Sequence, residues 1–139
     1  MSDPQKENKS LKQFDKAKFL ALETYRKNGE TIRTTTFFAK FDGLLFISTT
    51  SNTGKVKRLR SNNKVRVVPS DFSGHVKGEW LDGSAKQVDN AEEINRVNHL
   101  LNKQHPILRR LRAITEIFSN AKRLVYSIET DGSKRSAAK

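Results

Sequence analysis

LLFISTTSNTGKVKRLRSNNKVRVVPS, residues 44–70, has the pattern of a strand, a polar loop, a short basic helix and a second strand. Residues 44–47 are an apolar run rich in strand-forming residues, and three hydroxyl-bearing residues follow them. Ser51 and Thr53 are both candidate N-caps for the helix, in which Val56 and Leu59 would face the core. The two asparagines at 62 and 63 end the helix, and residues 65–68 resume a strand.

The start of this predicted helix resembles an anion-binding site. Its unpaired N–H groups and the positive end of its dipole favour a phosphate. Lys55 lies in the first turn, and Arg58 lies one turn later on the same face. Cations at a helix start oppose the dipole by roughly 0.3–1 kcal/mol each, and a bound anion would reverse that penalty. The alternative interpretation is a solvated face of a basic helix.

Length and composition limit the class of protein. A chain of 139 residues with 35% hydrophobic and 30% charged residues is long enough for one domain with a buried core. We expect that domain at residues 13–130, between disordered tails at 1–12 and 131–139. The absence of cysteine excludes disulfides and thiolate metal sites. No apolar run reaches membrane-spanning length and no signal-peptide core is present, so we expect a cytoplasmic protein without a membrane partner.

The net charge of +12 and the pI near 10.2 indicate an anionic partner. Nucleic acid, anionic lipid and a strongly anionic small molecule are the three classes that fit. The excess is concentrated in two segments. Residues 55–66 hold six basic and no acidic side chains, and residues 103–123 hold six basic side chains against one glutamate.

The hydrophobic pattern predicts a mainly β fold with six antiparallel strands, at residues 19–26, 31–41, 44–47, 65–68, 75–88 and 123–130. Asn28-Gly29 and Asp42-Gly43 predict tight turns between the first three. Gly78 and Gly83 would mark bends within the fifth strand. Besides the basic helix, a helix is expected at residues 91–103, capped by Asp89 or Asn90. Another is expected from Pro106, with an apolar stripe at Ile107, Leu111, Ile114 and Phe118. The pattern predicts a small antiparallel barrel with two or three peripheral helices.

The sequence contains no catalytic group that we can name. It has no GxGxxG or GxSxG motif, and Gly54-Lys55 lacks the upstream glycine and following hydroxyl of a P-loop. The three histidines do not have the spacing of metal ligands, and no acid–base pair stands out. We therefore predict no catalytic and no metal-binding residues. A protein with phosphate-binding groups but no such side chains would rely on a cofactor for its chemistry.

The series FLALETYRKNGETIRTTTFFAKFDGLLFISTTSNTGKVKRLRSNNKVRVVPSDFSGHVKGEWLDGSA, residues 19–85, resembles the pyridoxamine 5'-phosphate oxidase-like, FMN-binding split barrels. It is most similar to their deazaflavin-dependent oxidoreductase branch. That branch carries a similar TGKVKRLR-NN-VRV core and a similar strand around Trp80 and Gly83. The late helices and the closing strand also fit the family, so the resemblance covers most of the chain.

The resemblance implies a homodimer of six-stranded split β-barrels with two cofactor sites at the dimer interface. The cofactor would be FMN or the deazaflavin coenzyme (F-420 type), whose acidic tail could use Lys57, Arg60 and the 103–123 cluster. The second strand would run along the flavin ring, and the hydroxyls and cations of residues 48–58 would hold the ring edge, ribityl chain and phosphate. Trp80, which the residues alone suggest is a core aromatic, would approach from the partner chain. The implied cofactor-binding residues are Arg33, Thr34, Thr35, Thr36, Ser48, Thr49, Thr50, Gly54, Lys55, Arg58 and Trp80.

These expectations combine into a flavin- or deazaflavin-dependent oxidoreductase that transfers hydride to or from an unidentified small molecule. A true pyridoxamine phosphate oxidase is not expected, because the chain lacks the C-terminal substrate-binding segment of those enzymes. One alternative is a cofactor-binding protein without turnover. The other is a basic β-barrel that stacks single-stranded nucleic acid on Phe37, Phe38, Phe41 and Phe72. Phe37 and Phe38 lie on opposite strand faces, however, so one of them should be buried.

Overall fold

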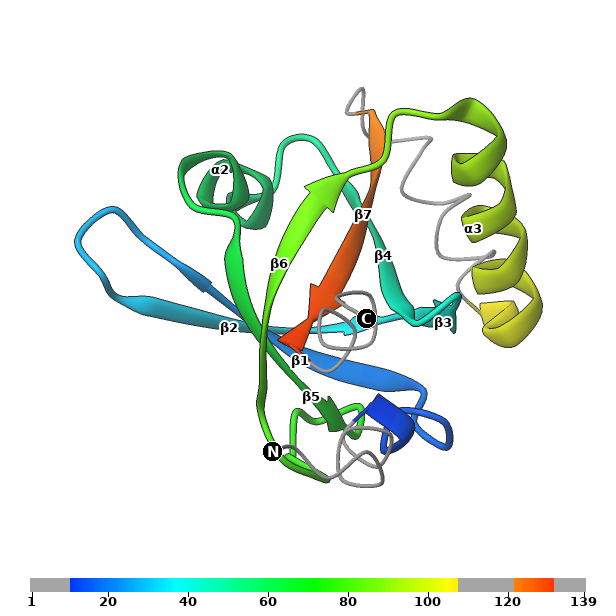
Figure 1. Ribbon diagram of the computed structural model, residues 1–139, viewed down its shortest axis with the longest axis horizontal. Helices are drawn as coiled ribbons and strands as arrows, with labels where there is room; N and C mark the ends of the chain where they lie inside the picture. Colours follow the sequence, from blue (N-terminus) through cyan, green and yellow to red (C-terminus); the bar gives the residue numbers. More distant parts are fainter. Residues whose placement is uncertain (1–10, 108–121, 132–139) are drawn as a thin grey trace.

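The computed structural model describes residues 11–107 and 122–131. Its strands form one antiparallel sheet in the order β2-β1-β5-β6-β7-β4-β3, and the sheet is strongly curled (Figure 1). Helix α2 (Gly54–Ser61) lies at one end of the curled sheet, and α3 (Ala91–Gln104) lies beside β3 and β4. The strands are β1 (Phe19–Tyr25), β2 (Thr31–Phe37), β3 (Ala39–Phe41), β4 (Leu44–Thr50), β5 (Lys64–Ser70), β6 (Leu81–Gln87) and β7 (Arg123–Thr130).

The sheet curls because one extended segment serves both of its edges. Residues 31–41 were predicted as a single strand, but the structure divides them at Phe38 into β2 and β3. β2 pairs with β1, whereas β3 pairs with β4 at the opposite end of the strand order. Phe38 packs in the main core and Ala39 packs with Phe46 on the opposite face of the sheet, so the alternation of strand faces continues across this division. The expected count of six strands was therefore wrong by one.

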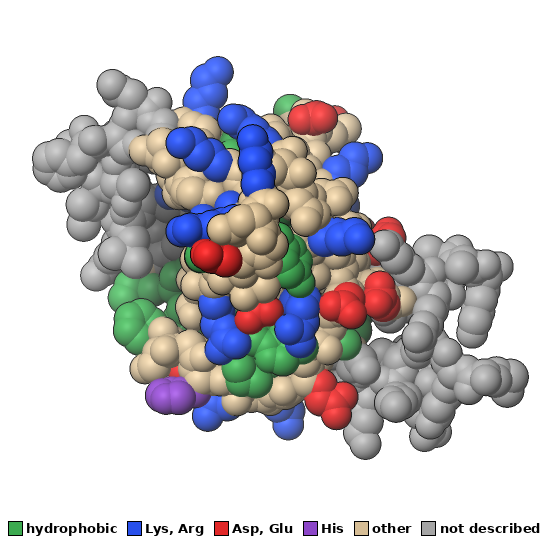
Figure 2. All heavy atoms as spheres, turned by 90° about the vertical axis from the view of Figure 1, so that its left-hand side faces the viewer, with side chains coloured by type: hydrophobic (Ala, Val, Ile, Leu, Met, Phe, Trp, Pro, Cys, Tyr) green, Lys and Arg blue, Asp and Glu red, His purple; other side chains and the backbone are tan. Residues whose placement is uncertain are grey.

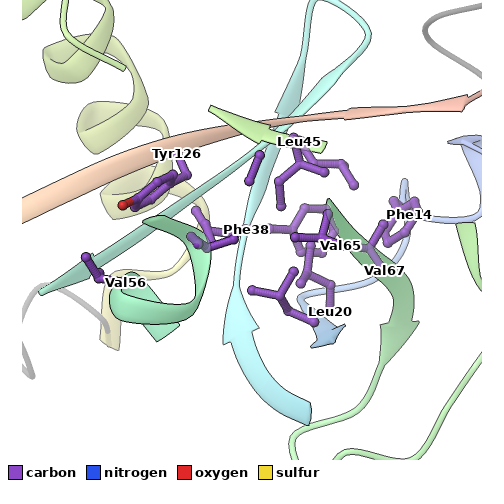
Figure 3. Packing of buried hydrophobic residues seen from close by; sticks show 13 residues of the cluster. Phe14, Leu20, Phe38, Leu45, Val56, Val65, Val67 and Tyr126 are labelled. Carbon is purple, nitrogen blue, oxygen red and sulfur yellow. The ribbon is translucent and has the colours of Figure 1, made fainter. Parts of the chain in front are cut away.

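The interior of the curled sheet holds the main core (Figure 3). Alternate residues of β1, β4, β5 and β7 supply most of it, as half-buried strands require. Val56 and Leu59 of α2 belong to the same cluster, so the helix closes one end of the barrel, as its spacing predicted. The labelled members include Leu20 of β1, Leu45 of β4 and Tyr126 of β7.

A second, smaller core lies between the outer face of β4 and β7 and the helix α3. Phe46 and Val125 point away from the barrel interior and pack with Val97 and Leu101 of α3. Asn90 caps this helix by accepting a hydrogen bond from the Glu93 N–H at 3.0 Å. The prediction of a helix here, with Asn90 as one of two possible caps, is confirmed.

Several strand boundaries differ from the predicted ones. The strand expected at residues 75–88 begins only at Leu81, and residues 71–80 form an irregular loop with one bridge between Ser70 and Val76. Gly78 therefore does not bend a strand. β4 continues past residue 47 to Thr50. The Asp42-Gly43 turn is confirmed by positive φ angles of 54° and 73°, and β7 has the predicted bounds. The stripe expected from Ile107 to Phe118 lies outside the described residues after its first member.

In the described ranges, no helix has both the length and the apolar character needed to cross a membrane.

Candidate functional site

The loop between β4 and α2 is held by its own hydroxyl groups. Thr53, rather than Ser51, is the N-cap of α2, and its Oγ1 accepts from the Val56 N–H at 3.4 Å. The same hydroxyl donates to the Thr50 carbonyl at 3.1 Å and lies 3.3 Å from the Thr49 Oγ1. Ser51 instead joins the loop to Lys122. The Ser51 N–H donates to the Lys122 carbonyl at 2.8 Å, and the Lys122 N–H donates to the Ser51 Oγ at 3.2 Å. This bonding fixes the direction in which the helix start faces.

Arg58 folds back over the first turn of its own helix. A Cβ atom built on Gly54 would lie only 2.8 Å from Nη1 of Arg58, so the guanidinium occupies the space that a side chain at residue 54 would need. Arg58 Nε also donates to Thr24 Oγ1 of β1 at 2.5 Å. The absence of a side chain at Gly54 thus lets a cation lie beside the helix N-terminus.

The two cations at this helix start are poorly compensated. Burial, and then the nearby charge of Arg58, lower the pKa of Lys55 below its ordinary value. Desolvation, and then the charge of Arg26, lower the pKa of Arg58. The first turn of α2 contains no acidic residue, and within the described chain neither cation forms an ion pair with a carboxylate. An anion placed here would offset the repulsion and interact favourably with the dipole.

The predicted residues of β2 and β4 lie on strands that do not pair with each other. β2 pairs with β1, and β4 pairs with β3 and β7, so among the described strands no ladder joins β2 to β4. Thr34 Oγ1 is buried on β2 with no hydrogen-bond partner. Thr36 Oγ1 donates to the Phe37 carbonyl at 3.2 Å, and Ser48 Oγ accepts from Arg123 at 3.4 Å. Thr34 therefore leaves one buried hydroxyl of β2 without a hydrogen-bond partner.

Arg33 and Trp80 belong to a different group on the outer face of the sheet, which we call the Glu23 cluster (Glu23, Arg33, Arg66 and Trp80). Buried Glu23 accepts from Arg33 and from Arg66, at 3.2 Å each. The two guanidinium carbons lie 4.8 and 4.9 Å from the centre of the Trp80 ring. Figure 2 shows that Lys and Arg side chains are spread over much of this side of the molecule, but the cations of the Glu23 cluster are paired.

The eleven predicted residues therefore do not form a single group in the structure. Thr49, Thr50, Gly54, Lys55 and Arg58 come together at α2. Arg33 and Trp80 lie in the Glu23 cluster, and Thr35 is exposed on the same strand as Arg33. Sequence reasoning missed Thr24, which anchors Arg58 from 34 residues away. No local pattern could have revealed that contact, because it depends on how α2 packs against β1.

Three pockets lie elsewhere on the described surface. Their volumes are about 650, 620 and 460 Å³, and none of them is lined by a residue predicted to bind the cofactor. Within the described residues there is also no group of three or more His, Cys, Asp or Glu side chains able to hold a metal ion. The candidate site is therefore defined by the cations and hydroxyls at α2 rather than by one of these pockets.

No family model and no curated protein matches the chain, but solved structures of the same fold do. A candidate pyridoxamine 5'-phosphate oxidase from Listeria innocua has a TM-score of 0.62 at 14% identity, over 90% of this chain and 93% of that protein. A FAD-binding protein from Mesorhizobium loti has a TM-score of 0.59 at 17% identity, over 86% and 84% of the two chains. The heme storage protein HutZ from Vibrio cholerae has a TM-score of 0.63 at 15% identity, over 94% and 92%. The chain has the pyridoxamine 5'-phosphate oxidase-like split-barrel fold, as the resemblance implied.

Proposed function

We propose that this chain binds a phosphate-bearing flavin-type cofactor, either FMN or the deazaflavin coenzyme, with the phosphate at the first turn of α2. The main support is the pair formed by Lys55 and Arg58. Both cations are partly desolvated at a helix N-terminus, and neither has a carboxylate partner in the described chain. A phosphate supplies the negative charge that this arrangement lacks.

The remaining predicted residues have roles that follow from their positions. The side-chain-free Gly54 leaves room for the Arg58 guanidinium beside the phosphate. Ser48, Thr49 and Thr50 follow the buried part of β4 and would contact the ribityl chain or ring edge. Thr34 offers an unpaired hydroxyl from β2, with Thr36 on the same strand face. Arg33, Thr35 and Trp80 lie on the outer face of the sheet. In our proposal they approach the cofactor of a second subunit in a homodimer.

The bound cofactor would accept and donate hydride, and the protein would orient it and exclude water around it. The site has no acid or base that we assign to the reaction, so the partner substrate would be a small redox-active molecule reacting directly with the cofactor. We therefore propose an oxidoreductase. The heme storage function of the Vibrio cholerae protein with this fold makes a binding protein without turnover the specific alternative.

The first experiment is the absorption spectrum of the purified protein, followed by titration with FMN, deazaflavin and haemin. We expect a flavin or deazaflavin spectrum, or saturable binding of one of the two. Saturable binding of haemin alone would support the alternative and contradict the proposal.

A pair of double variants then tests the phosphate position. Lys55→Ala with Arg58→Ala should weaken binding of the preferred cofactor at least about tenfold, because charge-assisted hydrogen bonds contribute about 1.5–3 kcal/mol each. Lys57→Ala with Arg60→Ala is the matched control, since it removes two exposed cations from the same helix. The control should leave FMN affinity unchanged and weaken only deazaflavin with its acidic tail. Equal affinities of the first variant and the parent would show that the phosphate lies elsewhere.

The structure weakens the nucleic-acid alternative. Phe38 is 3% exposed, which confirms that one of the two adjacent phenylalanines is buried. Phe41 stacks on Phe46 of the second core at 4.3 Å between ring centres. Two of the four rings needed for a base-stacking surface are therefore occupied by packing. Salt-sensitive retention of a single-stranded oligonucleotide, without a bound chromophore, would favour this alternative.

A further inference from the structure

The geometry points to a second small-molecule site at the opposite end of β1 from α2, built for a planar aromatic anion of about the size of a nucleoside monophosphate. The pocket has a volume of about 460 Å³, within the range typical of ligand sites. Phe19 lies at the pocket and Thr24 at α2, and these two residues are five positions apart along β1, which corresponds to about 16 Å. The ten lining residues are Gln13, Lys16, Ala17, Lys18, Phe19, Pro69, Ser70, Asp71, Phe72 and Lys77.

Its aromatic wall is unusually exposed. Phe72 is 80% exposed and meets the Phe19 ring edge to face, with ring centres 5.7 Å apart. The turn that carries Phe72 is fixed by Asp71, which accepts from the His75 N–H at 2.9 Å and whose carbonyl accepts from the Gly74 N–H at 3.0 Å. The ring is thus held out in solvent by an ordered turn. A planar ring placed against Phe72 would remove this apolar surface from water.

Its charges favour an anion. Lys16, Lys18 and Lys77 line the pocket against the single carboxylate of Asp71. Asp71 already contacts the His75 ring at 3.1 Å and Lys77 at 3.9 Å. In the described part of the chain, neither Lys16 nor Lys18 forms an ion pair. In such a pocket the aromatic wall can stack against the planar ring of a ligand, while the lysines at the rim pair with a negative group of the same ligand.

The two walls of the pocket are joined, so it is preformed. The Gln13 side chain donates to the Glu79 carbonyl and accepts from the Glu79 N–H, at 2.9 Å each, and so ties residues 11–18 to the loop at 71–80. This contact requires Gly78, because a Cβ there would lie 2.1 Å from the Gln13 oxygen and 3.3 Å from Pro69 Cδ. Buried Phe14 anchors the same wall in the main core. A preformed pocket loses little ordering entropy when a ligand binds.

The probes are AMP, adenosine and ribose 5-phosphate, with binding followed by calorimetry and by NMR of the Phe72 ring. We expect AMP to bind at least about tenfold more tightly than either fragment, because only AMP carries both ring and charge. Phe72→Ala should weaken AMP binding at least fivefold, and Lys18→Gln should weaken it by about twofold to fivefold. The controls are Val76→Ala, which trims a neighbouring exposed residue of the same loop, and Lys64→Gln, which removes an exposed lysine from the other end of β5.

The variant with Lys55→Ala and Arg58→Ala separates this site from the cofactor site. It should retain AMP binding, so failure of the proposed function and failure of this inference give different results. AMP binding that is lost only in that variant would overturn the inference. So would equal binding by Phe72→Ala and the parent, or absence of binding to the parent at millimolar AMP. Co-sedimentation with phosphatidylserine vesicles that depends on Phe72, without AMP binding, would also overturn it in favour of a lipid surface.

Discussion

Glu23 and Thr24 are neighbours on β1, and each accepts hydrogen bonds from a different group of cations. The two groups differ in whether a carboxylate compensates their positive charge. Glu23 points outward and accepts from Arg33 and Arg66, and Asp82 lies 3.6 Å from Arg66, so both arginines have carboxylate partners. Thr24 points to the other face and receives Arg58, which lies near Lys55 with no carboxylate partner in the described chain. Both groups contribute to the net charge of +12. Only the second lacks a carboxylate partner in the described chain.

The difference shows that the number of basic residues in a segment does not identify a binding site. Arg33 was predicted from the resemblance, and Lys55 from the helix start as well as the resemblance. The structure pairs Arg33 with Glu23 and leaves Lys55 without a carboxylate partner in the described chain. Charge compensation is a tertiary property, because it depends on which strand face each side chain occupies. Four experiments test this contrast.

The largest expected effect is on stability, at the compensated group. Glu23→Gln removes the carboxylate that accepts from both arginines and leaves two facing cations, so we expect a loss of about 2–3 kcal/mol in the free energy of unfolding. The arginines are half exposed, which limits the loss. Urea denaturation measures it, with Glu30→Gln at an exposed i,i+4 pair as the control. A loss no larger than that of the control would show that the Glu23 cluster is not a stabilising group.

The next effect is on binding, at the uncompensated group. Gly54→Ala places a Cβ where the Arg58 guanidinium lies, so the flexible guanidinium must move. We expect roughly tenfold weaker cofactor binding, equal to about 1.4 kcal/mol, with a change in stability below about 1 kcal/mol. In an Arg58→Ala background the same substitution should cost little further affinity. Additive losses would mean that Gly54 acts independently of Arg58.

A smaller effect is expected in the pH dependence of binding. Since burial and Arg58 lower the pKa of free Lys55, the lysine loses its proton below its ordinary value of 10.5. A bound phosphate favours the charged form, so affinity should fall severalfold as the pH rises through that lowered pKa. The Lys55→Arg variant should keep its positive charge, so its affinity for the cofactor should stay constant across the same pH range. Isothermal titration at a series of alkaline pH values makes the comparison, and identical profiles for both proteins would contradict a role for Lys55.

The smallest effect is on the stability of the cofactor-free protein. A lysine whose folded pKa is lowered destabilises the fold at all pH values below that pKa, and the penalty disappears as the pH rises toward 10.5. Lys55→Met should therefore raise the free energy of unfolding near neutral pH by less than about 1 kcal/mol. The gain should vanish at alkaline pH. A loss of stability at neutral pH would mean that the charge of Lys55 is already compensated.

Local patterns were sufficient for most elements of the fold. The spacing of Val56 and Leu59 predicted both the helix α2 and its buried face, because three residues bring side chains to the same side of a helix. The Asp42-Gly43 turn and the bounds of β7 were also correct. The strand predicted to start at residue 75 begins only at Leu81, because residues 75–80 make a single bridge to Ser70 and the Glu79 backbone is bonded by the Gln13 side chain. The break at Phe38 was missed because its cause is the change of pairing partner from β1 to β4.

For the candidate site, the sequence was enough to identify the α2 start, since the hydroxyl loop, Gly54 and the two cations lie within a few residues of one another. Helix geometry alone brings those groups together. The tertiary structure alone decided that Arg58 is anchored by Thr24, that Arg33 and Trp80 share the outer Glu23 cluster, and that Gly78 admits the Gln13 side chain beside Phe72 and its pocket. Those contacts join residues 10 to 66 positions apart. They depend on strand order and on which face each residue occupies, and neither property is contained in a local pattern.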